Sequence, residues 1–218
     1  MSSAARAGSD DIERRIGGLR AKPWGWLVPA VVLGSLVPFA AIAQRAAAGR
    51  LGADPIATAL NQLGLLALLF LMASLACTPV KVLFGLTWPM RVRRTLGLFA
   101  FGAALTHFAV YVVLDQMLML RAIVVDVAKR PFIAVGFSAL VLLVPLAWTS
   151  SKEAVRKLGF KRWKLLHRLV YVVGALAVIH FVLRVKVGME PLVYASVLAA
   201  LLAIRAFDWV RARKRRRA

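Results

Sequence analysis

Six long apolar stretches, separated by charged or polar segments, dominate the sequence. They cover residues 24–43, 60–76, 95–114, 132–148, 163–183 and 191–207. An α-helix rises about 1.5 Å per residue, so about 20 apolar residues cross the roughly 30 Å hydrocarbon core of a bilayer. No water reaches that core, and a helix satisfies its backbone hydrogen bonds within one segment. The pattern therefore predicts an all-α fold, an integral membrane bundle of about six transmembrane helices.

The segments outside these stretches predict one domain with two tails. No sequence repeat or low-complexity linker divides the chain. We expect a cytoplasmic N-terminal tail over residues 1–23, a transmembrane domain over residues 24–208 and a basic cytoplasmic tail over residues 209–218. The N-terminal tail lacks the apolar core of a signal peptide. Tryptophans at the ends of the stretches are expected to be interfacial anchors.

Lysine and arginine are distributed unevenly between the two sides of the predicted bundle. Of the 30 basic residues, 23 fall in the N-terminal tail, the loops after the second and fourth stretches and the C-terminal end, and 7 fall on the other side. Cytoplasmic loops of membrane proteins carry such an excess. We therefore predict that both termini are cytoplasmic. The same bias explains the net charge of +21 without a nucleic-acid partner, because no basic amphipathic helix with interleaved aromatic residues is present.

All three histidines lie inside predicted spans, where polar side chains are costly and tend to be functional. A single histidine in a span also serves as a hydrogen bond between helices. His107 follows Arg94 by 13 residues, and His180 follows His167 by 13, which puts both about 20 Å from the cytoplasmic end. A haem between two helices requires two imidazoles at one depth. We predict that His107 and His180 are its axial ligands, near the outer face.

His167 lies about one turn inside the cytoplasmic end of the fifth stretch. Arg93, just before the third stretch, belongs to a group of basic residues at the same end. Such a group favours anionic ligands, which include haem propionates, a flavin phosphate and acidic lipid. The alternative for most of these basic residues is that they only fix the orientation of the chain in the membrane. For His167 and Arg93 we predict that they shape a cofactor site through which electrons reach the chain.

Several kinds of chemistry are excluded by what the sequence lacks. The single cysteine, Cys77, forms no internal disulfide, and no C-x-x-C-H string is present to attach haem covalently. No G-x-G-x-x-G string, Walker motif or catalytic pair of carboxylates is present either. Electrons from a nicotinamide nucleotide would therefore have to come through another protein.

Local strings along the chain resemble the MsrQ (YedZ) family, the haem-binding membrane subunits of protein-methionine-sulfoxide reductase systems, within the ferric reductase-like transmembrane superfamily. The resemblance covers nearly all of residues 24–207. It is carried by residues 51–55 (LGADP), 78–79 (TP), 93–98 (RRTLGL), 130–131 (RP), 157–163 (KLGFKRW), 166–167 (LH), Tyr171 and 179–180 (IH).

This resemblance implies a cofactor set and a set of partners. It implies b-type haem bound by His107, His167 and His180, with residues 24–208 as the ferric reductase-like haem domain, and it associates the family with FMN. The chain would be a non-catalytic electron-transfer subunit in the bacterial inner membrane. Electrons would come from the quinone pool or a cytosolic flavin reductase. They would pass to a periplasmic, molybdopterin-containing, MsrP-like methionine sulfoxide reductase that repairs oxidised proteins.

The sequence departs from the two-haem members of the superfamily, which carry two histidines on each of two helices. Here the third stretch holds only His107, and Arg93 stands near the position of the missing ligand. Three roles stay open for His167: ligand of a five-coordinate haem, contact to a flavin or quinone, or indirect support of the outer haem. A stand-alone ferric or quinone reductase is the alternative function. A transporter or scaffold is less favoured, because no mid-span carboxylates or inverted halves are present.

Overall fold

The structure is a computed structural model that describes residues 24–185 and 188–215. Every regular element in these residues is helical, and six helical segments are long and apolar enough to cross a membrane. The predicted all-α membrane bundle is therefore confirmed. The predicted tail over residues 1–23 lies outside the described residues. The predicted boundary between residues 208 and 209 falls inside one continuous helix, α10 (Glu190–Arg215).

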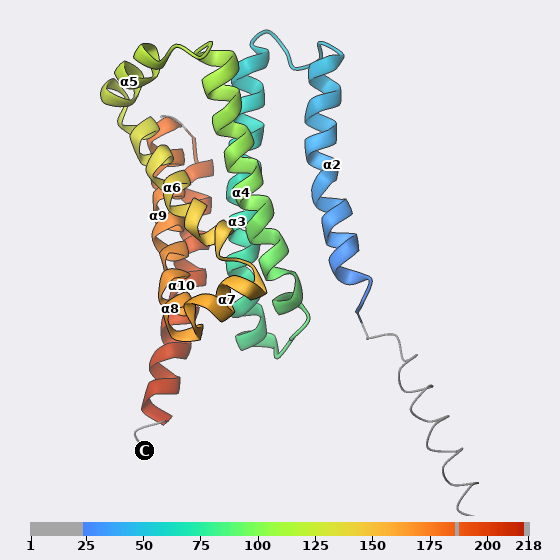
Figure 1. Cartoon of the computed structure of the whole chain (residues 1–218), viewed down its shortest axis with the longest axis vertical. Helices are drawn as coiled ribbons and strands as arrows, with labels where there is room; N and C mark the ends of the chain where they lie inside the picture. Colours follow the sequence, from blue (N-terminus) through green and yellow to red (C-terminus); the bar gives the residue numbers. More distant parts are fainter. Residues whose placement is uncertain (1–23, 186–187, 216–218) are drawn as a thin grey trace, which may run out of the picture.

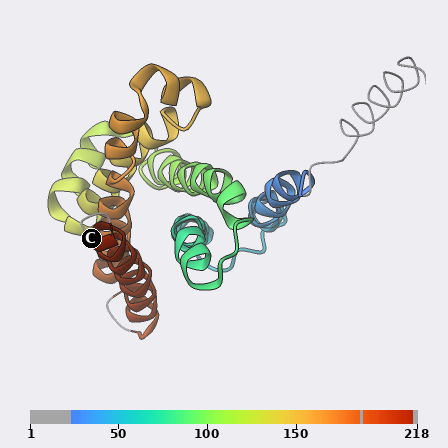
Figure 2. The ribbon, with the colours of Figure 1, turned by 90° about the horizontal axis from the view of Figure 1, so that it is seen from below.

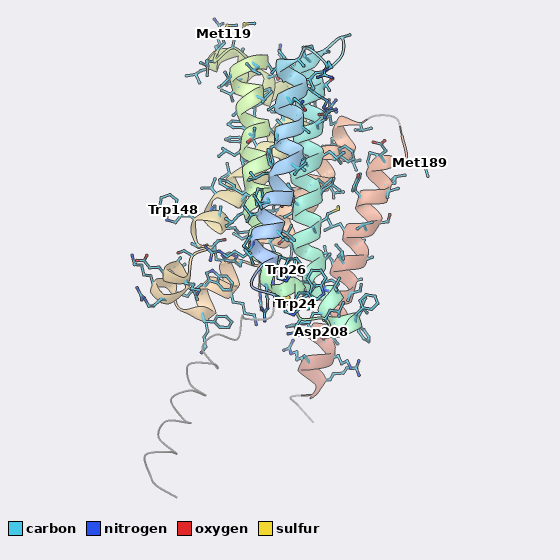
Figure 3. All side chains as sticks on the ribbon, turned by 90° about the vertical axis from the view of Figure 1, so that its right-hand side faces the viewer. Trp24, Trp26, Met119, Trp148, Met189 and Asp208 are labelled. Carbon is cyan, nitrogen blue, oxygen red and sulfur yellow. The ribbon has the colours of Figure 1, made fainter. Side chains whose placement is uncertain are left out.

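The six spans are arranged as a bundle of roughly parallel and antiparallel helices (Figure 1). They consist of α2 (Leu27–Ala47), α3 (Pro55–Phe84), α4 (Pro89–Val110) continued by the π-helix η1 (Tyr111–Asp115), α6 (Pro131–Trp148), α8 (Phe160–Leu166) with α9 (Leu169–Arg184), and α10. The beginning of α2 and the end of α10 lie at the same end of the bundle (Figure 1), which we call the terminal end. Trp24, Trp26 and Asp208 lie toward it, and Met119 and Met189 toward the opposite end (Figure 3).

Two helix pairs form the frame of the bundle. α3 runs toward the terminal end and α4 returns, and α6 and α9 repeat this course (Figure 1). α10 packs on α9 and α3, whereas α2 lies on the side of α4 away from α6, α9 and α10 (Figure 2). A core of apolar side chains joins the pairs, with Leu75 from α3, Ala100 from α4, Leu143 from α6 and Val173 from α9 all almost fully buried. The two pairs therefore face each other across one shared core.

Helix caps extend α3 beyond the stretch predicted from hydropathy. The Asp54 side chain accepts a hydrogen bond of 2.9 Å from the backbone N–H of Ala57, and Pro55 occupies the first turn. Both features favour helix initiation. At the other end, Gly85 adopts a left-handed conformation with φ of 70°, which a helix C-terminus commonly requires. α3 is therefore 30 residues long, not 17.

The predicted span over residues 163–183 is found within one segment, residues 160–184, but its helix is interrupted at His167 and Arg168. α8 ends at Leu166, and α9 begins at Leu169. Between them, hydrogen bonds run from Arg168 N to Leu165 O (3.1 Å) and from Tyr171 N to Arg168 O (3.0 Å), so the chain tightens into three-residue turns. Two short helices, α5 (Leu120–Lys129) and α7 (Lys152–Leu158), were also missed because they are not long apolar stretches.

Candidate functional site

The structure brings His107 and His180 together. His107 lies near the end of α4 and His180 near the end of α9, so each comes from a different helix pair. Their ring centres are 6.3 Å apart, and the ring planes are nearly perpendicular at 83°. The common depth predicted from the sequence is therefore seen in the structure, and it places the two rings in direct proximity.

Backbone carbonyls hold both rings in one tautomer. Nδ1 of His107 lies 2.9 Å from the carbonyl oxygen of Leu60 on α3, and Nδ1 of His180 lies 2.6 Å from that of Phe132 on α6. A carbonyl oxygen only accepts hydrogen bonds, so Nδ1 must carry the proton in each ring. In the neutral imidazole this leaves Nε2 with a free lone pair. Metal-binding histidines are commonly held in this way, with the second nitrogen as the ligand.

The separation of the two rings fits one metal ion bound by both. A bond between imidazole nitrogen and a first-row transition metal is about 2 Å long, so two such bonds in line, with the two ring radii, set the ring centres about 6 Å apart. The observed 6.3 Å agrees with this requirement. One aromatic ring packs on the pair, because the ring of Phe132 lies 6.0 Å from that of His180. The donor set therefore suits a haem with two histidine ligands.

A second candidate site lies toward the terminal end, in a cavity of about 980 Å³ that we call the basic cavity. His167, Trp163 and Tyr171 line it together with side chains of α4, α6 and α10. No Asp or Glu lines it in the part of the chain that the structure describes, whereas six basic residues do: Arg93, Arg94, Lys152, Lys164, Arg168 and Arg205. This composition favours an anionic ligand, because like charges without counter-ions repel each other.

His167 is held differently from the other two histidines. Its Nε2 lies 3.0 Å from the hydroxyl oxygen of Thr149, and that hydroxyl donates its proton to the carbonyl of Pro145 at 2.6 Å. The hydroxyl therefore accepts from His167, and Nε2 carries the proton. Trp163 packs on the imidazole at 4.2 Å between ring centres and donates its indole N–H to the carbonyl of Thr149 at 2.9 Å. The structure thus places His167 in an aromatic wall of the basic cavity, with Nε2 already engaged.

Arg205 reaches into the same cavity from α10. Its guanidinium donates to the Tyr171 hydroxyl at 2.9 Å and to the carbonyl of Leu75 at 2.7 Å. Its Nε atom is buried and has no hydrogen-bond partner among the described residues. From the sequence, Arg205 counted only toward the charge bias of the C-terminal end, and Trp163 only as an interfacial anchor. The signals were an arginine within the stretch over residues 191–207 and a tryptophan one helical turn before His167.

The fold and the paired histidines define a class of membrane protein. A family model described as ferric reductase like transmembrane component matches residues 58–178, more than half of the chain. The match includes His107 and His167 and ends two residues before His180. The chain is thus a ferric reductase-like transmembrane component.

Three relatives identify the family within this class of membrane protein. Each is named protein-methionine-sulfoxide reductase heme-binding subunit MsrQ. The relative from Deinococcus radiodurans is 49% identical over 84% of this chain and 90% of its own length. The relative from Rhodospirillum rubrum is 47% identical over 87% and 91%, and that from Brucella anthropi is 45% identical over 94% and 89%. The chain belongs to the MsrQ family, which confirms the resemblance predicted from its local strings.

Proposed function

We propose that the chain is the transmembrane electron-transfer subunit of a methionine sulfoxide reductase system, with b-type haem bound between His107 and His180. The observation that carries this proposal is the 6.3 Å separation of two imidazole rings held by backbone carbonyls on different helix pairs. When bound, haem supplies a one-electron carrier with a potential set by its ligands. The two histidines would hold it through their Nε2 atoms.

The basic cavity is proposed as the site that accepts electrons on the cytoplasmic side, with FMN as its ligand. Six cationic side chains, with no carboxylate beside them among the described lining residues, suit the FMN phosphate. The adjoining rings of Phe160, Trp163 and His167 offer a surface on which a flat ring system stacks. Nε2 of His167 already donates to the Thr149 hydroxyl. This argues against His167 as a haem ligand through Nε2, the atom that we propose as the ligand in His107 and His180. This favours a flavin contact among the three roles that the sequence left open.

The proposed acceptor on the far side is a periplasmic, molybdopterin-containing methionine sulfoxide reductase in the bacterial inner-membrane system. The names of the relatives describe a heme-binding subunit of a protein-methionine-sulfoxide reductase. The proposed donor is the quinone pool or a cytosolic flavin reductase, as the family resemblance implies. In this assignment the chain conducts electrons and carries out no substrate chemistry of its own.

A visible absorption spectrum of the detergent-purified chain tests the proposed cofactors. We expect the bands of reduced low-spin b-type haem after addition of dithionite, a pyridine haemochrome of non-covalent haem, and FMN in an acid extract. Protein that is folded and free of haem after expression with ample haem supply would contradict the electron-transfer proposal. Haem without FMN would contradict only the ligand proposed for the basic cavity.

The proposed orientation makes a separate prediction. The bias of 23 basic residues to 7 predicts that both termini are cytoplasmic. A reporter enzyme that is active only in the periplasm should be silent when fused after Ala218 and active when inserted after Gly52, in the turn between α2 and α3. The reverse pattern of activities would show that the chain has the opposite orientation in the membrane, with the histidine pair near the cytoplasm.

A further inference from the structure

The two backbone carbonyls that bond to His107 and His180 share a feature of local sequence. Each belongs to a residue that lies four positions before a glycine on the same helix. Leu60 precedes Gly64 on α3, and Phe132 precedes Gly136 on α6. The histidines follow their carbonyl partners by 47 and 48 residues, respectively. The two helix pairs therefore repeat one arrangement of carbonyl, glycine and imidazole.

The glycines lie where a side chain would displace the imidazole. A Cβ atom added to Gly136 would lie 2.6 Å from Nδ1 and 2.7 Å from Cε1 of His180. A Cβ added to Gly64 would lie 3.3 Å from the same two atoms of His107. The contacts at Gly136 are impossible unless the ring of His180 moves, whereas those at Gly64 demand a shift of only a few tenths of an ångström.

Helix geometry explains why the glycine follows the carbonyl by four residues. In an α-helix, the carbonyl of one residue bonds to the N–H four residues later. A second donor that approaches this oxygen from outside the helix passes beside the side chain of that later residue. When the later residue is glycine, the approach is open and the two backbones come close. The ring then shares a carbonyl that the helix already uses.

This close contact is not a general property of glycines in the spans. Gly34 in α2 and Gly102 in α4 also lie inside membrane helices, and an added Cβ would meet no atom within 4 Å at either position. Gly102 is only five residues before His107 on the same helix. Gly64 and Gly136 differ from them in that the nearest atoms to an added Cβ belong to a histidine ring.

We infer that Gly64 and Gly136 are positioning residues for the haem ligands. Each glycine opens a backbone carbonyl to the Nδ1–H of one histidine, which leaves Nε2 as the ligand nitrogen and fixes the ring plane. The inference rests on the proposed function, in which His107 and His180 bind the haem iron. A hydrogen bond from Nδ1–H to a carbonyl makes the imidazole a more basic ligand, so it also lowers the potential of the bound haem.

The test compares Gly136→Ala, Gly64→Ala and the matched control Gly102→Ala in the detergent-purified full chain. The measurements are haem content, the low-spin electron paramagnetic resonance spectrum and the midpoint potential. Gly136→Ala should shift the spectrum, raise the potential and weaken haem retention about 10- to 100-fold, as loss of an outer-shell partner does. Gly64→Ala should give smaller shifts in the same directions, and Gly102→Ala should match the unaltered chain.

Gly64→Ala, for which a smaller effect is expected, keeps the inference testable if the Gly136→Ala protein does not accumulate. Gly64→Ala requires only a small movement, and its spectrum and potential must still differ from those of Gly102→Ala. Equal spectra and potentials for Gly64→Ala, Gly136→Ala and Gly102→Ala would overturn the positioning role while leaving the haem ligands in place. An unaltered chain without low-spin haem would overturn the ligand assignment and, with it, this inference.

Discussion

Replacement of either His107 or His180 by alanine should abolish most of the low-spin haem signal of the purified chain. Each ring supplies one of the two ligand nitrogens in the proposed site, and the rings are 6.3 Å apart. Phe132, the aromatic side chain that packs on His180, binds no metal. Loss of one ring therefore leaves the iron with at most one histidine ligand. Haem content and the absorption and resonance spectra of each variant would measure the loss.

His167→Ala is the matched control, because it also removes an imidazole from the same bundle. His167 lies in the wall of the basic cavity, bonded to Thr149, and so should leave the low-spin signal in place. The ligand assignment fails if His107→Ala and His180→Ala both keep full haem content and an unchanged spectrum. Loss of the low-spin signal in His167→Ala alone would indicate that the haem binds in the basic cavity.

The second large effect is expected on the rate at which electrons reach the haem. His167→Ala and Arg93→Ala should slow its reduction by about 10-fold or more while haem content falls much less. Both side chains line the basic cavity, and one hydrogen bond to a charged group contributes about 1.5–3 kcal/mol, or at least tenfold in affinity. Stopped-flow mixing with dithionite-reduced FMN, normalised to haem content, would measure the rate.

Arg156→Ala provides a charge-matched control for Arg93→Ala. Arg156 is exposed on α7 at the same end of the molecule and does not line the basic cavity. Its removal changes the net charge equally and should leave the rate of reduction within twofold of the unaltered chain. Normal rates in His167→Ala and Arg93→Ala would make both residues structural. Equal slowing in all three variants would indicate a diffuse effect of charge.

The six spans and the histidine pair could be predicted because both follow from quantities that a sequence displays directly. Apolar length identifies a span, and the residue count from a charged end gives depth, so His107 and His180 could be placed at one level. The interruption at His167 could not be predicted in this way. No proline or glycine stands beside it, and the turn is accompanied by contacts of His167 with Thr149 and Trp163.

The basic cavity was predicted only in part, because its members come from separate helices. Arg93 and His167 were expected at one end of the bundle, but their depth does not say which other side chains face them. Arg205 and Tyr171 meet through a hydrogen bond between α10 and α9. Such a pairing depends on helix rotation and crossing, which the apolar pattern of an almost uniformly hydrophobic span does not specify.

The carbonyl oxygens that hold His107 and His180 belong to the backbone, and this sets how the site tolerates mutation. Any residue that maintains the helix supplies the same oxygen at position 60, so Leu60 should accept varied side chains with little cost to the imidazole. At position 64 even one methyl group reaches the ring. Random mutagenesis with selection for haem retention should therefore recover many residues at position 60, few at position 64 and fewest at position 136. After the two histidines themselves, the most constrained positions of this site would be residues that have no side chain at all.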